Sequence, residues 1–251
     1  MKNSTRKKFT SRLSDVLLET IAPTCRCLSC GKDVFDGTGF CSDCAKRVTY
    51  NNGKTCKRCG VGIDGAEDYC GNCAFDKIYF DRAYSVFCYD GAVRNAILHM
   101  KFNNLGSYAK VFAKYLIFMA EKVNLSYDVV TFAPMSAKAK RTRRYNQAQL
   151  LAKYFCYLQD KDSLLTEAII KIKDTEPQES LNKADRKTNL VGTYEINADV
   201  TGKRVLVIDD VKTTGSTLNE CAKVLKRAGA TSVYALTVAA RKEHFDDETE
   251  W

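Results

Sequence analysis

Two adjacent acids, followed by hydroxyl residues around a glycine, give this chain its clearest chemical pattern. The apolar stretch Val205–Ile208 precedes Asp209 and Asp210, and Thr213–Thr217 reads Thr-Thr-Gly-Ser-Thr. Two acids at the end of a buried strand are unusual, because charge is costly in apolar surroundings. A helix that begins at Ser216 would offer the unpaired N–H groups and the positive dipole end that favour a phosphate. The pattern predicts a phosphate cradle, with two carboxylates placed to accept hydrogen bonds from sugar hydroxyls.

The turn within this segment is not a Walker A loop, because no Gly-Lys-Ser/Thr ends it. Gly215 permits a close approach of the backbone to a ligand, and the neighbouring hydroxyls add donors. The alternative is a plain strand–turn–helix whose hydroxyls only cap the helix. That alternative leaves the two acids unexplained.

A second chemical pattern lies near the N-terminus, where nine of the 12 cysteines fall between Cys25 and Cys73. They include four Cys-x-x-Cys pairs, which are Cys27/Cys30, Cys41/Cys44, Cys56/Cys59 and Cys70/Cys73. Each such turn aims two thiolates at one point, and two turns complete a tetrahedral zinc site. Eight thiolates therefore predict two structural zinc ions. Sequential pairing is the simpler arrangement, and a cross-braced one stays open; Cys25 is interpreted as a bystander, although it could replace Cys27.

The rest of the chain must supply the elements that position these residues. Apolar segments of strand type alternate with helical patterns of ten or more residues, which predicts an α/β fold with a doubly wound, mostly parallel sheet. In such sheets ligands bind beyond the carboxyl ends of the strands. The expected strands are Tyr127–Ala133, Ala168–Ile172, Arg204–Ile208 and Ser232–Ala239, with a strand pair or hairpin edge over Ile78–Tyr89, and the expected helices are Ala92–Phe102, Tyr108–Val123, Asn146–Leu158, Gln178–Leu190 and Ser216–Ala228.

Composition divides the chain into a basic N-terminal segment (1–24), a zinc-binding module (25–76), a main domain (77–245) and a short tail (246–251). The net charge of +9 favours an anionic partner or serves solubility alone. No apolar run approaches the roughly 20 residues that span a bilayer. The apolar stretch after the basic N-terminus is too short for a signal peptide. We therefore expect a cytoplasmic protein without membrane insertion.

The segment Val205–Leu218 resembles the phosphoribosyl diphosphate (PRPP) binding motif of type I phosphoribosyltransferases. From about Cys27 to Arg241 the chain is similar to the ComF family of competence proteins (ComFC-like), in which a zinc module precedes such a domain. Further segments that resemble blocks of this family are Tyr89–Gly91 with Ile97–Phe102, Pro134–Ser136, Arg143–Ala148, and the set Gln178, Leu181, Arg186 and Asn189. One departure is Arg144, which stands where the family usually has glycine.

The resemblance implies a site for PRPP with Mg²⁺. The implied PRPP-binding residues are Asp209, Asp210, Lys212, Thr213, Thr214, Gly215, Ser216 and Thr217, of which Asp209 and Asp210 are the implied catalytic acids. The implied pyrophosphate loop and its surroundings comprise Pro134, Met135, Ser136, Lys138, Arg141, Arg143, Arg144 and Asn146. The basic run Lys138–Arg144 is also consistent with a patch that follows the phosphates of single-stranded DNA, with Tyr145 as a stacking platform, or with a solvated loop.

Three functions follow from these patterns together with what the family resemblance implies. The first is a glycosyltransferase that moves a phosphoribosyl group from PRPP to an unidentified acceptor. The second is a catalytically silent PRPP- or phosphate-binding module that binds single-stranded DNA and competence or recombination proteins during natural transformation. The third is a zinc adaptor that docks partner proteins, which predicts that deleting residues 1–75 abolishes partner binding and leaves the PRPP pocket intact. His99 is interpreted as a capping or core histidine, and the role of Lys101 is left open.

Overall fold

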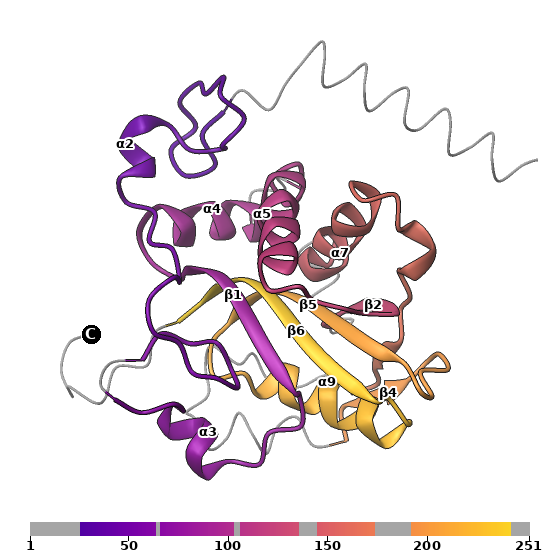
Figure 1. Cartoon of the computed structure of the whole chain (residues 1–251). Helices are drawn as coiled ribbons and strands as arrows, with labels where there is room; N and C mark the ends of the chain where they lie inside the picture. The colour runs from indigo at the N-terminus through magenta and orange to yellow at the C-terminus, as the bar shows by residue number, and fades with distance from the viewer. Residues whose placement is uncertain (1–25, 64–65, 103–105, 136–144, 174–191, 242–251) are drawn as a thin grey trace, which may run out of the picture.

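The structure is a computed structural model that describes residues 26–63, 66–102, 106–135, 145–173 and 192–241. Its centre is a four-stranded parallel sheet in the order β1-β6-β5-β2 (Figure 1). The antiparallel strands β3 and β4 form a second, two-stranded sheet. The strands are β1 (Arg82–Cys88), β2 (Val129–Phe132), β3 (Ile169–Lys171), β4 (Tyr194–Ile196), β5 (Arg204–Lys212) and β6 (Ser232–Ala240).

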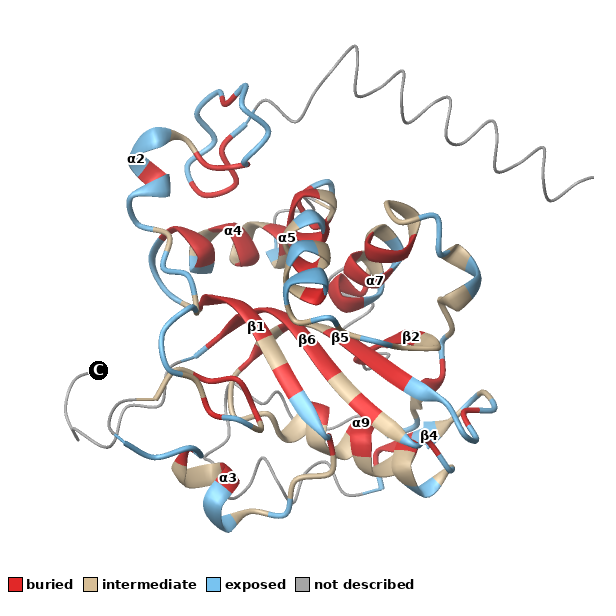
Figure 2. Cartoon of the chain, in the orientation of Figure 1, coloured by how far each residue is buried: buried red, intermediate tan, exposed pale blue. Residues whose placement is uncertain are grey.

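Helices cover both faces of the parallel sheet, which confirms the doubly wound fold (Figure 1). One face carries α4 (Gly91–Phe102), α5 (Tyr108–Lys122) and α7 (Gln147–Tyr157), and the other carries α9 (Ser216–Arg227). The buried positions of α9 are Leu218, Cys221, Ala222 and Leu225, the spacing of a single apolar stripe. Figure 2 shows the consequence, because buried residues line the inner sides of the helices and fill the middle strands. The short elements are α2 (Ser42–Ala45), α3 (Gly71–Phe75) and η1 (Asp162–Leu164).

Several elements differ from the expected ranges. The segment Ile78–Tyr89 supplies one edge strand, β1, rather than a strand pair, because β1 pairs in parallel with β6. Strand β5 continues four residues beyond Ile208 to Lys212, because β6 extends the ladder beside it. Strand β4 was not expected at all. The expected helix Gln178–Leu190 lies outside the described residues.

The two halves of the cysteine-rich region pack on opposite faces of the sheet. We call residues 26–44 the first ribbon and residues 55–75 the second ribbon. The first ribbon buries Leu28 and Phe40 in the core beneath α4 and α5. The second ribbon buries Val61 in the core beneath α9. Between them the chain runs along the edge of β1, where Asn51 N donates to Val86 O at 2.9 Å and Cys88 N donates to Thr49 O at 2.9 Å.

Each ribbon is fixed to the main domain by specific contacts. On the first ribbon, the Leu28 carbonyl lies 3.1 Å from His99 Nδ1 of α4, so this histidine ties a helix to the ribbon, as the core interpretation expects. On the second ribbon, Gly60 has a φ of +67°, and a Cβ there would overlap the Ala83 carbonyl oxygen of β1. Only glycine allows this combination of backbone angle and close approach. The cysteine-rich region is therefore continuous with both cores.

Candidate functional site

The predicted phosphate cradle is a tight turn between β5 and α9. Gly215 occupies the N-cap position of α9 with a φ of +79°, the left-handed region in which glycine is strongly preferred. Because Gly215 has no side chain, it leaves the first-turn N–H groups of α9 to a ligand or to neighbouring hydroxyls. Thr214 Oγ1 lies 2.8 Å from Ser216 Oγ, so two hydroxyls flank the turn. This is the backbone arrangement that favours a phosphate at a helix N-terminus.

Lys212 is the most informative side chain of this turn. The residue is only 5% exposed. Its stem lies against the turn, since a Cβ at Gly215 would be 3.4 Å from Lys212 Cε. Among the residues that the structure describes, no carboxylate or carbonyl pairs with its ammonium, although Cys59 lies within electrostatic reach. Lys212 also lines a cavity beside this turn, and its Nζ is not among the fully buried polar atoms that lack a partner. The ammonium therefore faces the cavity, and its positive charge there favours an anionic ligand.

The two acids lie in the last part of β5 and are more enclosed than the sequence indicated. Lys101 Nζ of α4 lies 3.3 Å from Asp210 Oδ2, and both side chains are 12% exposed. Asp209 is in register with Thr237 and Ser85, whose hydroxyls lie 2.7 Å apart, so the three residues share one face of the sheet. Burial of the Asp209 carboxyl, with the charge of Asp210 beside it, raises its pKa to about 7.

The raised pKa of Asp209 makes stability depend on pH. In the unfolded chain the carboxyl ionises near its ordinary pKa of 3.8, whereas in the folded chain it stays protonated up to about pH 7. The folded state therefore loses stability relative to the unfolded state as the pH rises through this window. We expect Asp209→Asn to raise the Tm at pH 8 and to leave it unchanged at pH 4. Thermal melts across this range measure the effect, and an equal gain at both pH values would contradict the assignment.

A cavity of about 300 Å³ opens beside the turn. On one side lie Lys212, Thr214, Gly215 and Ser216 together with Asn219 and Glu220 of α9, and on the other lie Cys59, Asn72 and Cys73 of the second ribbon and the following residues Asp76, Lys77, Ile78, Tyr79 and Phe80. The acids Asp209 and Asp210 are not part of this lining. The cavity therefore reaches the cradle from the side of the second ribbon. This wall could not be predicted from the sequence, because residues 76–80 carry no motif.

The expected pyrophosphate loop is only partly described. Pro134 and Met135 follow β2, whereas Ser136, Lys138, Lys140, Arg141, Arg143 and Arg144 lie outside the described residues, as do Cys25, Gln178, Leu181, Arg186 and Asn189. Asn146 is a buried N-cap of α7, whose Oδ1 accepts from Ala148 N at 3.0 Å and whose Nδ2 donates to Ala133 O at 2.9 Å. Its amide thus connects the end of β2 to α7, which is a positioning role.

Tyr145, the expected stacking platform, is half-buried beside α4. Its hydroxyl donates to the Met100 carbonyl of α4 at 2.6 Å, and its ring lies against Gly106. Both contacts hold the ring against the main domain.

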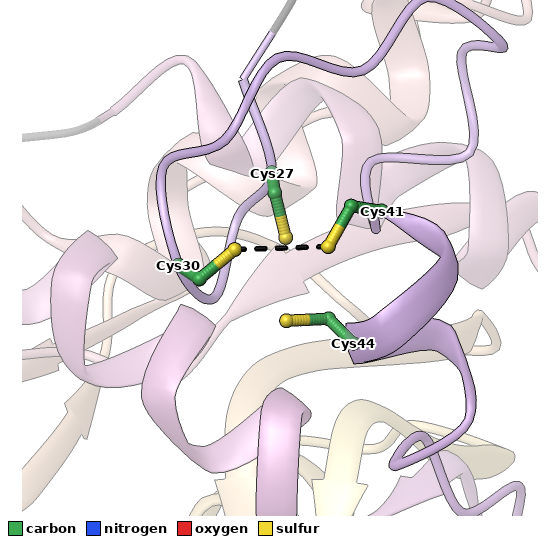
Figure 3. Close-up of side chains that lie close together, drawn as sticks. All are labelled: Cys27, Cys30, Cys41 and Cys44. Carbon is green, nitrogen blue, oxygen red and sulfur yellow. Dashed lines mark hydrogen bonds between the residues drawn. The ribbon is translucent and has the colours of Figure 1, made fainter.

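The eight paired cysteines gather into two groups, each formed by sequential pairs. Figure 3 shows the first group, in which the sulfurs of Cys27, Cys30, Cys41 and Cys44 point toward one centre. The second group is Cys56, Cys59, Cys70 and Cys73, and within each group the ligand atoms lie within 4.8 Å of one another. The Cys30–Cys41 and Cys59–Cys70 sulfurs lie 3.7 and 3.5 Å apart. Tetrahedral zinc with bonds of about 2.3 Å places its sulfurs roughly 3.8 Å apart, so both groups fit structural zinc.

Comparison with known proteins gives the same two parts. The Double zinc ribbon domain family matches residues 17–74, and the Phosphoribosyl transferase domain family matches residues 148–250. Competence protein F of Haemophilus influenzae is 27% identical over 217 residues, which cover 83% of this chain and 93% of that protein. DNA utilization protein YhgH of Escherichia coli is 28% identical, covering 78% of this chain and 87% of that protein. Competence protein ComFC of Streptococcus pneumoniae is 30% identical, covering 59% and 64%.

The chain therefore joins a double zinc ribbon to a phosphoribosyltransferase-like domain. It is a homologue of Competence protein F, ComFC and YhgH. Among the described residues, no helix has the length and apolar character needed to cross a membrane.

Proposed function

We propose that the protein binds PRPP at the start of α9 and transfers its phosphoribosyl group to an acceptor that is still to be identified. The observation that supports this most is Lys212, a largely enclosed residue whose ammonium faces the cavity with no bonded partner among the described residues, beside a turn that favours phosphate. The 5-phosphate would lie against Thr213–Thr217, with Lys212 neutralising its charge. PRPP would enter as its Mg²⁺ complex, since Mg²⁺ binds through phosphate oxygens.

In this proposal Asp209 and Asp210 contact the ribose of PRPP. Lys101 Nζ lies 3.3 Å from Oδ2 of Asp210, and in this proposal Oδ1 accepts a hydrogen bond from a ribose hydroxyl. In the reaction, the bond from C1 of the ribose to pyrophosphate breaks while the acceptor forms a new bond to C1. Positive charge develops on the ribose, and carboxylates nearby stabilise it. The loop that begins at Pro134 and Met135 would hold the departing pyrophosphate.

The test is a calorimetric titration with PRPP and Mg²⁺. Removing one charge-assisted hydrogen bond costs about 1.5–3 kcal/mol, so Asp210→Asn should weaken binding by roughly 10- to 100-fold. Asp128→Asn is the matched control, because Asp128 pairs with exposed Arg204 at the opposite end of β5. Absence of a binding signal in the wild-type protein would refute the proposal, as would an Asp210→Asn protein with wild-type affinity.

Turnover is tested separately by pyrophosphate release in the presence of candidate acceptors. The alternative, a silent module that binds single-stranded DNA and protein partners, predicts PRPP binding without release. Two features were expected to contact DNA. The basic run Lys138–Arg144 lies outside the described residues, and Tyr145 is held against α4 by its hydroxyl. The name of the relative YhgH, a DNA utilization protein, is compatible with either.

A further inference from the structure

The wall of the cavity opposite the cradle comes from the second ribbon. Cys59 and Cys73, two members of its cysteine group, line the same cavity as Gly215 and Ser216. Lys212 lies between them, with its stem against Gly215 and its charge within reach of Cys59. Four thiolates around Zn²⁺ keep a net negative charge, and Lys212 lies between this charge and a bound phosphate, so the ammonium offsets the repulsion between the two anions.

Asn219 of α9 holds this wall in place. Its Oδ1 accepts from Tyr79 N at 2.7 Å, and its Nδ2 donates to the Lys77 carbonyl at 3.0 Å. Both polar atoms of the amide are thus used by the segment that follows the ribbon. Asn219 lies one turn after Ser216, so it connects the wall directly to the first turn of α9.

The first ribbon has no such relation to the cradle. It packs on the other face of the sheet, where Tyr115 of α5 donates to the Thr38 carbonyl at 2.8 Å. None of its residues lines the cavity beside the cradle. The two cysteine groups therefore form an internal comparison within one chain.

We propose that zinc in the second ribbon and a phosphate ester in the cradle are coupled energetically, that zinc in the first ribbon is not, and that Asn219 is the positioning residue for this coupling. The inference rests on the proposed phosphate site. Coupling is reciprocal, so if zinc strengthens phosphate binding, then phosphate must strengthen zinc binding. This gives a measurement that does not depend on enzymatic turnover.

The experiment follows zinc transfer to a chromogenic chelator with and without saturating ribose 5-phosphate. In the wild-type protein at equilibrium with the chelator, we expect the ligand to tighten the binding of one of two zinc equivalents by roughly 5- to 100-fold, for a typical coupling energy. Cys41→Ser, which disables the first group, should keep this protection. Cys70→Ser, which disables the second group, should lose it and should bind ribose 5-phosphate at least about 5-fold more weakly.

Two further variants, Asn219→Ala at the second ribbon and Tyr115→Phe at the first, leave all zinc ligands in place. They test the same coupling if a cysteine variant fails to fold. Asn219→Ala should weaken the equilibrium binding of one zinc and reduce protection by the ligand, whereas Tyr115→Phe should leave the protection unchanged. Equal protection in Cys41→Ser and Cys70→Ser, or in Asn219→Ala and wild type, would overturn the coupling. If the wild-type protein binds ribose 5-phosphate but shows no protection, the coupling alone is wrong. If it binds neither ribose 5-phosphate nor PRPP, the proposed function fails and the coupling with it.

Discussion

Lys212→Met is expected to weaken the binding of PRPP and ribose 5-phosphate by about 100-fold and to raise the Tm of the ligand-free protein. The first effect follows because a charge-assisted contact to phosphate is worth about 2–3 kcal/mol, and 1.4 kcal/mol corresponds to a factor of ten. The second follows because Lys212 is enclosed over most of its surface and its ammonium faces the cavity without a bonded partner among the described residues, whereas methionine fills similar space without a charge. A gain of about 1 kcal/mol would raise the Tm by roughly 2–4 °C in a chain of this size.

Lys226→Met provides the matched control for this prediction. Lys226 lies in the last turn of the same helix, where it pairs with Asp81 at 2.8 Å and donates to the Thr231 carbonyl at 2.8 Å. Its replacement should leave the affinity for PRPP unchanged and lower the Tm slightly, which is the opposite sign. Calorimetric titration and thermal melts measure both quantities. Unchanged affinity in Lys212→Met would remove Lys212 from the site, and a fall in its Tm would show that the ammonium is already satisfied in the free protein.

The sequence predicts the local part of this site well, because that part depends on short-range chemistry. The apolar residues Val205–Ile208 specify a strand, and the apolar stripe from Leu218 specifies a helix, so the turn between them is fixed. Cys-x-x-Cys turns with ten or eleven residues between successive pairs likewise favour sequential grouping, the simpler of the two arrangements considered. The end of β5 was misjudged because acids oppose a buried strand locally, whereas the ladder with β6 is a tertiary effect.

What the sequence could not predict is the set of contacts made between distant segments. Lys101 reaches Asp210 from α4, and Asn219 binds Tyr79 and Lys77 across 140 and 142 residues of sequence. Neither contact leaves a periodic pattern, since one lysine and one asparagine are common on any helix. The packing of the two ribbons on opposite faces of the sheet could not be predicted from the sequence either. The two cysteine repeats are similar, so they carry no information about which core each ribbon joins.

Deleting residues 1–75 is expected to prevent the remaining chain from folding, contrary to a zinc adaptor that can be removed from an intact pocket. Leu28, Phe40 and Val61 are at most 4% exposed, and they belong to the cores on both faces of the sheet. Burying each such side chain contributes about 1.5–3 kcal/mol, so three of them approach the total stability of a typical domain, about 5–15 kcal/mol. The deletion also uncovers the outer edge of β1, along which Thr49 and Asn51 run.

The expected product is an aggregated or loosely packed chain, seen as loss of a cooperative melt and of near-ultraviolet circular dichroism. Supplying residues 1–75 as a separate zinc-loaded peptide should restore the melt, because the missing surface would then be covered again. The peptide without zinc should not do so, since a four-cysteine ribbon depends on its metal for folding energy. A soluble chain of residues 76–251 that melts cooperatively and binds PRPP with wild-type affinity would show that the ribbons are accessories. The shared cores lead us to expect instead that zinc binding, folding and the phosphate pocket form one cooperative unit.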